Sequence, residues 1–157
     1  MKKLILVVCV LFFWGCSIKQ ENFRYLSLQQ CQKTPWKDVG VADVELPDYF
    51  IDDRFPYREN GVLGYLEDRL ARDPSSFLTS CAAKMLGGCV YPWECRKKPK
   101  KIYHIKIEEF YYDRSKDVVI LIASEDHKEY LIKKRVNGDP LKSAFDAYKE
   151  LIAQIGR

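Results

Sequence analysis

The sequence predicts an α+β fold, with a single mainly antiparallel sheet and two helices packed on one face. Segments 102–113, 117–124 and 128–136 show the alternation or the β-branched apolar runs of strands. The clearest amphipathic helix follows them, with helical spacing of Leu141, Ala144, Phe145, Tyr148, Leu151, Ile152 and Ile155. Strands, helix, three strands and helix in this order are typical of a two-layer domain.

The first half of the chain is expected to supply further strands. The segment FRYLSLQQC (23–31) alternates between two faces, and VGVADVEL (39–46) is a second strand. Asn60-Gly61 lies between two short arms in 55–65, which predicts a tight hairpin turn.

A first helix is expected to begin after Asp73, an N-cap followed by Pro in the first helical position, and to end at Gly87-Gly88. Its apolar face would carry Phe77, Leu78, Cys81, Ala82, Met85 and Leu86. A short helical turn over 66–72 is expected before this helix, and an irregular loop over 89–101 after it.

The second half contains a meander of strands. The alternation changes phase at Glu108-Glu109, which predicts a β-bulge. The continuous apolar run within 117–124 predicts a central, buried strand. Asp139-Pro140 is expected to cap the last helix.

The N-terminus has the pattern of a secretory leader. Two lysines precede an apolar run from Leu4 to Trp14, which is too short to span a membrane stably. Its end at Gly15-Cys16 resembles a bacterial lipobox. The expected organisation is a signal peptide over 1–15, acylation of Cys16, a tether over 16–22 and one domain over 23–157. A cleaved, soluble secreted protein is the alternative.

Sorting of the lipoprotein depends on the residue after the acylated cysteine. Ser17 occupies this position, and by the usual pattern it directs the protein to the outer membrane rather than the inner one. We therefore expect a lipid-anchored protein on the periplasmic face of the outer membrane.

Four cysteines remain beyond residue 16: Cys31, Cys81, Cys89 and Cys95. An even number in an oxidising compartment predicts two disulfides, which can be connected in three ways. We favour Cys31–Cys81, which would join a strand end to the inward face of a helix, and Cys89–Cys95 within one loop. A zinc site is the alternative, but the spacing matches no common zinc module.

Charge and motifs argue against nucleic-acid binding and catalysis. Loss of 1–15 removes two of the 26 basic residues and none of the 22 acidic ones, which leaves a net charge of +2. His104 and His127 lie near no recognisable nucleophile, and no metalloprotease, P-loop or hydrolase motif occurs. Asp52-Asp53 and Glu108-Glu109 are adjacent pairs, which point to opposite faces of an extended chain. We predict no enzyme activity, no cofactor and no metal site.

The loop after the first helix is a candidate contact region for a membrane or a partner. It holds a basic run beside aromatic residues, at Tyr91, Trp93, Arg96, Lys97, Lys98, Lys100 and Lys101. Basic side chains near anionic headgroups contribute about 1 kcal/mol each. A solvated loop that keeps an exposed segment soluble is the alternative.

Several of these segments resemble a known family in the same order. After the lipobox come FRYLSL, then VGVADVELPDYF with its Leu46-Pro47-x-Tyr49 piece, then FPYRENGVLGYLEDRLA with Tyr57-Arg58. The segment IYHIKIEEFYYDRSKDVVILIA and an amphipathic helix close the match. The chain resembles the ABC-type transport auxiliary lipoproteins, the PqiC-like (DUF330) group associated with MCE-type lipid transport.

The resemblance implies a non-enzymatic auxiliary subunit that helps to move lipids between the inner and outer membranes. Its implied partners are an MCE-domain periplasmic protein and ABC transporter components, and the chain could also form a homo-oligomer. The alternative is a pilotin-like or assembly lipoprotein of a secretion or pilus machine. Segment 87–101 has no recognisable counterpart in the family.

Overall fold

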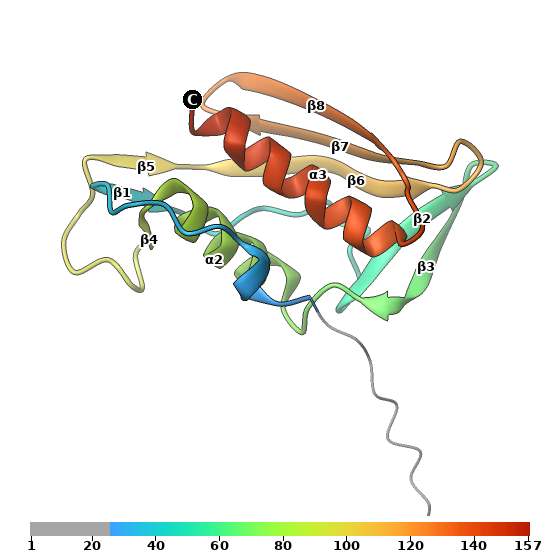
Figure 1. Ribbon diagram of the computed structural model, residues 1–157, viewed down its shortest axis with the longest axis horizontal. Helices are drawn as coiled ribbons and strands as arrows, with labels where there is room; N and C mark the ends of the chain where they lie inside the picture. Colours follow the sequence, from blue (N-terminus) through green and yellow to red (C-terminus); the bar gives the residue numbers. More distant parts are fainter. Residues whose placement is uncertain (1–25) are drawn as a thin grey trace, which may run out of the picture.

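The computed structural model describes residues 26–157, so the predicted leader, Cys16 and the start of the first predicted strand lie outside the described residues. The fold is α+β, as predicted, and both helices lie on the same side of the main sheet (Figure 1). That sheet has five strands in the order β3-β2-β6-β7-β8. Neither helix within 26–157 is long and apolar enough to cross a membrane.

One edge of the main sheet is the predicted hairpin. Strands β2 (Arg54–Glu59) and β3 (Val62–Arg69) pair antiparallel around Asn60-Gly61. Both turn residues have positive φ, 51° and 82°, as such a turn requires. The expected helical turn over 66–72 is wrong, because residues up to Arg69 continue β3 and Arg69 pairs with Arg54 of β2.

The other strands of this sheet form the predicted meander of β6 (Ile105–Asp113), β7 (Val118–Glu125) and β8 (Lys128–Arg135). The register shifts between Ile107 and Glu109, which confirms the bulge. Strand β7 is central, as predicted, but it is fully buried on one face only: Val119, Leu121 and Ala123 face the core, and the residues between them are half-buried.

A second sheet, which the sequence analysis did not predict, joins three short parallel strands in the order β4-β1-β5. They are β1 (Val39–Val41), β4 (Cys89–Val90) and β5 (Lys101–Tyr103). Strand β4 lies in the segment expected to be an irregular loop. The strand predicted over 39–46 is regular only to Val41, because Thr79 Oγ1 and the Ser75 hydroxyl of the adjacent helix take up the backbone N–H and C=O of Val44.

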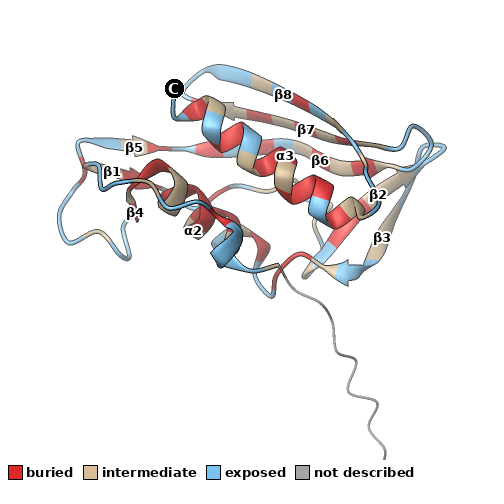
Figure 2. Cartoon of the chain, viewed as in Figure 1, coloured by how far each residue is buried: buried red, intermediate tan, exposed pale blue. Residues whose placement is uncertain are grey.

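The two helices match their predicted limits. Helix α2 (Pro74–Leu86) is capped by Asp73 and ends at Gly87 in the left-handed conformation, and α3 (Pro140–Ile155) is capped by Asp139. They pack against each other through Phe77 and Phe145, whose rings are 5.5 Å apart. Buried residues follow the inner sides of both helices (Figure 2).

The beginning of the described chain is not a strand. Residues Leu28–Gln30 form a 3-10 turn, η1, in which the Ser27 side chain accepts a hydrogen bond from the Gln29 N–H. Short polar side chains that bond the local backbone compete with strand pairing, so the strand predicted over 23–31 is wrong across its described part.

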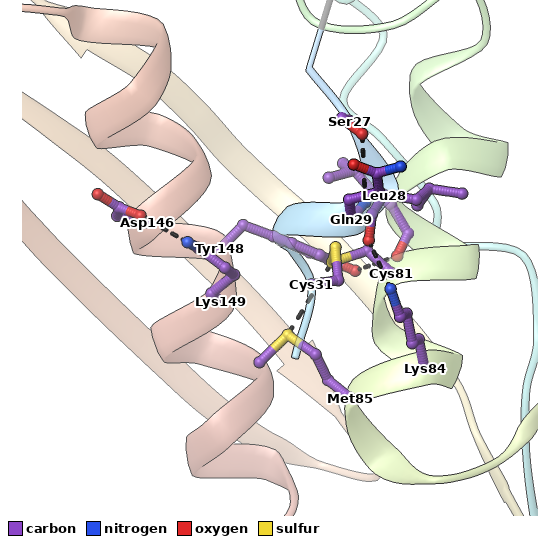
Figure 3. The surroundings of a disulfide bond; sticks show 11 residues. Ser27, Leu28, Gln29, Cys31, Cys81, Lys84, Met85, Asp146, Tyr148 and Lys149 are labelled. Atoms are coloured by element: carbon purple, nitrogen blue, oxygen red, sulfur yellow. Dashed lines mark hydrogen bonds and ion pairs between the residues drawn. A yellow bond between two sulfur atoms is a disulfide. The ribbon is translucent and has the colours of Figure 1, made fainter. Parts of the chain in front are cut away.

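A disulfide attaches this segment to α2. The predicted Cys31–Cys81 bond forms, and Met85 Sδ lies 3.9 Å from Cys81 Sγ (Figure 3). Lys84 also donates from Nζ to the carbonyl oxygen of Leu28 at 2.8 Å. The covalent bond and this hydrogen bond hold the start of the described chain on the helix layer.

Candidate functional site

Two sequence pieces that are separate in the chain meet at the β6 bulge. The Tyr49 hydroxyl donates to Glu109 Oε2 at 3.0 Å and accepts from the N–H of Phe110 at 2.7 Å. Arg58 Nη2 lies 3.2 Å from the same Glu109 oxygen. We call Tyr49, Arg58 and Glu109 the bulge cluster. It joins the Leu46-Pro47-x-Tyr49 piece to the Tyr57-Arg58 piece.

The strand pairing explains why these side chains converge. Strand β2 runs parallel to β6 and places Arg58 opposite Asp113. The Arg58 guanidinium then lies over the Tyr111 ring, 4.3 Å from its centroid, a cation–π contact. The Tyr65 hydroxyl, from β3, donates to the carbonyl oxygen of Tyr49 at 2.7 Å. The cluster is therefore supported from three strands.

The electrostatics of the cluster fit a structural or binding role. Desolvation by burial raises the pKa of Tyr49, so its hydroxyl stays protonated and able to donate in alkaline as well as neutral solution. Glu109 is engaged by a phenol and a guanidinium, whereas its neighbour Glu108 is exposed. The two glutamates therefore do not form a carboxylate pair.

Beside the cluster lies the sheet surface that faces away from the helices. The pairs Tyr111–Ile120 and Ile122–Leu131 stand next to each other there, with Leu131 56% exposed. We call the following residues the outer face: Arg58, Glu109, Tyr111, Val118, Ile120, Ile122 and Leu131. Within 26–157 no helix packs on this surface, which combines an apolar strip with the fixed charges of the bulge cluster on one side and exposed Lys133 and Arg135 of β8 on the other.

The predicted contact loop has the predicted disulfide, Cys89–Cys95. The structure places Trp93, Arg96, Lys97, Lys98 and Lys100 on its exposed surface, and Tyr91 is half-buried. Lys101 belongs to β5, where its Nζ lies 3.9 Å from a Glu125 carboxylate oxygen and 4.1 Å from the centroid of the Tyr103 ring.

The sequence analysis missed Trp36, which lies at this end of the molecule and is 68% exposed. It lines a groove of about 640 Å³ with residues of the loop, namely Glu94, Arg96, Lys97 and Pro99, and with Asp38, Gly88 and Cys89. Sequence reasoning had no signal for Trp36, because it stands alone in a polar segment. Its neighbours Thr34 and Lys37 bond to the end of α2, at Met85 and Gly87, and these long-range contacts bring it to the loop.

The loop is fixed on β1. Pro99 is buried, and a Cβ on Gly40 would lie 2.8 Å from its Cγ, so only a glycine leaves room for this contact. The Lys100 N–H donates to the Asp38 carbonyl at 3.1 Å, and the Glu94 N–H donates to the Val90 carbonyl at 2.8 Å. Together with the disulfide, these contacts hold both ends of the loop.

Residues 26–157 contain no group of three or more His, Cys, Asp or Glu side chains that could hold a metal ion. His104 is exposed between β5 and β6, and His127 is exposed in the β7–β8 turn. The four described cysteines form the two disulfides.

Comparisons with known proteins identify the fold. No protein-family model and no curated protein sequence matches this chain. The crystal structure of an uncharacterized protein is similar, with a TM-score of 0.64, 14% identity, and coverage of 87% of this chain and 98% of that one. The crystal structure of protein XCC0632 from Xanthomonas campestris, of family DUF330, is also similar, with a TM-score of 0.56, 12% identity, and coverage of 86% and 92%. At these identities the likeness establishes a shared fold over most of each chain.

Proposed function

We propose that this chain is a non-enzymatic auxiliary lipoprotein of the DUF330 type, which binds an MCE-domain protein of an ABC-energised lipid transport system. The observation that carries the proposal is the bulge cluster. It brings together the two sequence pieces that resemble the family, on a fold that XCC0632 shares. Both pieces shape the edge of one exposed surface.

The outer face is the docking surface in this proposal. The helices cover the opposite face of the sheet, and the apolar side chains of β7 and β8 on the outer face are left accessible. The cluster beside them is held by hydrogen bonds from β3 and β6, so little side-chain freedom is lost when a partner binds. A rigid apolar strip with a charged rim is a common anatomy of protein interfaces.

The anchor in this proposal is acylated Cys16 in the outer membrane. Nine residues, 17–25, separate Cys16 from the first described residue and can span at most about 30 Å, so the domain stays near its membrane. This suits an adaptor that receives the end of a long periplasmic partner. Palmitate labelling that disappears in Cys16→Ser, with release of the protein into the periplasm, is the expected result. Unchanged labelling in that variant would refute the anchor.

Capture of the partner tests the docking surface. The lipidated chain should recover an MCE-domain protein from envelope extracts. Leu131→Lys should lower the recovery by about tenfold, since it replaces the most exposed apolar side chain of the outer face with a charged one. Val62→Lys makes the same change at an exposed apolar residue of β3 outside the outer face, and it should leave recovery unchanged. Recovery of a secretin instead of any MCE or ABC component would favour the pilotin-like alternative.

A further inference from the structure

We propose that the end of the domain formed by Trp36 and the Cys89–Cys95 loop is a second membrane contact, which docks on an anionic phospholipid surface. We call Trp36 and residues 91–100 the loop end. The proposal does not depend on the partner suggested for the outer face, because the two regions share no residue.

The aromatic residues are the first observation. Both tryptophans of the described chain, Trp36 and Trp93, belong to the loop end, although they come from different segments. Trp36 is 68% exposed and Trp93 is 79% exposed. No other large aromatic side chain that the structure describes is as exposed. Indole rings have an apolar body and a polar N–H, and they are enriched at membrane–water interfaces.

The charges are the second observation. Arg96, Lys98 and Lys100 are exposed and form no ion pair with any residue in 26–157. Lys97 lies 3.9 Å from Asp38 but is 80% exposed, so this contact leaves its ammonium in water. The groove beside Trp36 is balanced, because Arg96 and Lys97 face the carboxylates of Asp38 and Glu94, and Asp43 and Asp73 line a second groove next to Trp93. Within residues 91–100 themselves, four basic side chains stand against the single carboxylate of Glu94, and this local surplus complements anionic headgroups.

The rigidity of the loop is the third observation. The disulfide, buried Pro99 and the backbone hydrogen bonds at Glu94 and Lys100 leave the loop little freedom. Trp93 is thus displayed on a fixed support instead of folding back onto the domain. A preorganised surface loses little conformational entropy when it docks.

The position of the loop end is the fourth observation. The loop projects beyond the short parallel sheet, at the end of the molecule away from the β2–β3 hairpin (Figure 1). Residue 26 lies elsewhere, next to Leu70 ahead of α2. A lipid chain near the N-terminus and the loop end would therefore touch the membrane at two separate places. The acyl chains hold the protein on the membrane, and a second contact fixes the orientation of the domain on it.

Bilayer quenching of tryptophan fluorescence tests the proposal on the lipidated chain. Trp14 belongs to the expected signal peptide, so Trp36 and Trp93 are the reporters in the chain that begins at Cys16. The purified chain is reconstituted in vesicles of brominated phosphatidylcholine, alone or with 30% phosphatidylglycerol. We expect blue-shifted emission and strong quenching only with phosphatidylglycerol, and we expect 0.5 M salt to weaken both effects.

Two triple variants, each of which removes three positive charges, are compared, and the second is the control. Arg96→Gln, Lys98→Gln and Lys100→Gln together should shift the docking equilibrium by roughly 100-fold, at about fivefold per charge. Lys128→Gln, Lys133→Gln and Arg135→Gln on β8 remove three exposed positive charges elsewhere and should leave quenching unchanged. Equal quenching in both kinds of vesicle, or equal losses in the two triple variants, would overturn the proposal. An emission maximum typical of water in every vesicle would do so as well, and would leave a protein as the occupant of the loop end.

Discussion

The hydroxyl of Tyr49 binds the carboxylate of Glu109 at 3.0 Å across 60 residues of sequence, at the point where β6 bulges. The same hydroxyl accepts the N–H of Phe110, in the part of β6 that β2 does not reach, because the pairing of β2 with β6 begins at Tyr112. The Tyr49 hydroxyl therefore donates one hydrogen bond to a carboxylate and accepts another from a backbone N–H. This relationship links the segment before β2 to the middle of the sheet.

Removal of that hydroxyl should destabilise the domain. Tyr49→Phe leaves the Phe110 N–H without its acceptor in a partly buried place, which costs roughly 1–3 kcal/mol of unfolding free energy. Urea denaturation measures the change. Tyr57→Phe is the matched control, because the Tyr57 hydroxyl makes no hydrogen bond among the described residues, and it should stay within about 0.5 kcal/mol of the native chain. Equal effects of the two substitutions would contradict this account of the cluster.

The two disulfides should differ in their contribution to stability. Cys31–Cys81 closes a sequence separation of 50 residues and Cys89–Cys95 one of 6, so the chain-entropy estimate gives about 4 and about 2 kcal/mol. Paired Cys→Ser variants, compared by thermal and urea unfolding, measure both. A larger loss of stability on removal of Cys89–Cys95 than on removal of Cys31–Cys81 would show that the entropy of the unfolded chain does not determine how much these disulfides stabilise the domain.

Two glycines with positive φ should respond differently to alanine. A Cβ on Gly138 meets nothing within 4 Å, so Gly138→Ala should cost only the backbone strain, about 1 kcal/mol. A Cβ on Gly87 would overlap the carbonyl oxygen of Pro35, so Gly87→Ala should cost at least about 3 kcal/mol. Thermal unfolding compares them. Because Pro35 precedes Trp36, Gly87→Ala should also change tryptophan emission. An unchanged emission spectrum together with a small loss of unfolding free energy would contradict the contact between Gly87 and Pro35.

Stability should fall in alkaline solution. Desolvation by burial raises the pKa of Tyr148, and it is also the main cause of the raised pKa of Tyr49. In the unfolded chain both phenols titrate near pH 10, so above this pH the folded state binds more protons than the unfolded state. The stabilisation is complete below about pH 10 and declines above it, by about 1.4 kcal/mol per pH unit for each phenol.

Urea unfolding between pH 8 and 11 measures this decline. Tyr148→Phe should make it shallower, although that variant also loses the hydrogen bond to the Leu78 carbonyl at 2.8 Å and starts from a lower stability. If the unfolding free energy falls with pH at the same rate in Tyr148→Phe as in the native chain, the Tyr148 phenol does not cause the alkaline loss of stability.

Sequence reasoning succeeded where the signal was local. The last helix, its Asp139 cap and the Asn60-Gly61 turn each depend on residues a few positions apart, and each is present as predicted. It failed where a distant partner decided the outcome. Residues 66–69 extend β3 because β2 lies beside them, and Val44 leaves β1 because Thr79 of α2 takes its N–H.

The candidate sites also differ in how far the sequence alone could predict them. The basic run and the disulfide pairing of the loop were accessible from the sequence, because charge and cysteine content are written in it. The bulge cluster was not, since no rule of spacing joins Tyr49 and Arg58 to Glu109. Trp36 reaches the loop end through long-range contacts, namely the parallel pairing of β1 with β4 and the hydrogen bond from the Lys37 N–H to the Gly87 carbonyl.

By itself, the sequence determined the α+β class, the limits of both helices, the hairpin turn and the bulge. These features follow from backbone propensity, capping and hydrophobic period, which act over a few residues. The sequence left three disulfide connectivities open, and the favoured one is present. Only the tertiary structure decided the second sheet, the meeting of Tyr49, Arg58 and Glu109, and the face of the main sheet that stays uncovered. Those outcomes depend on long-range strand pairing, whose register is set by packing of the whole core and not by any single segment.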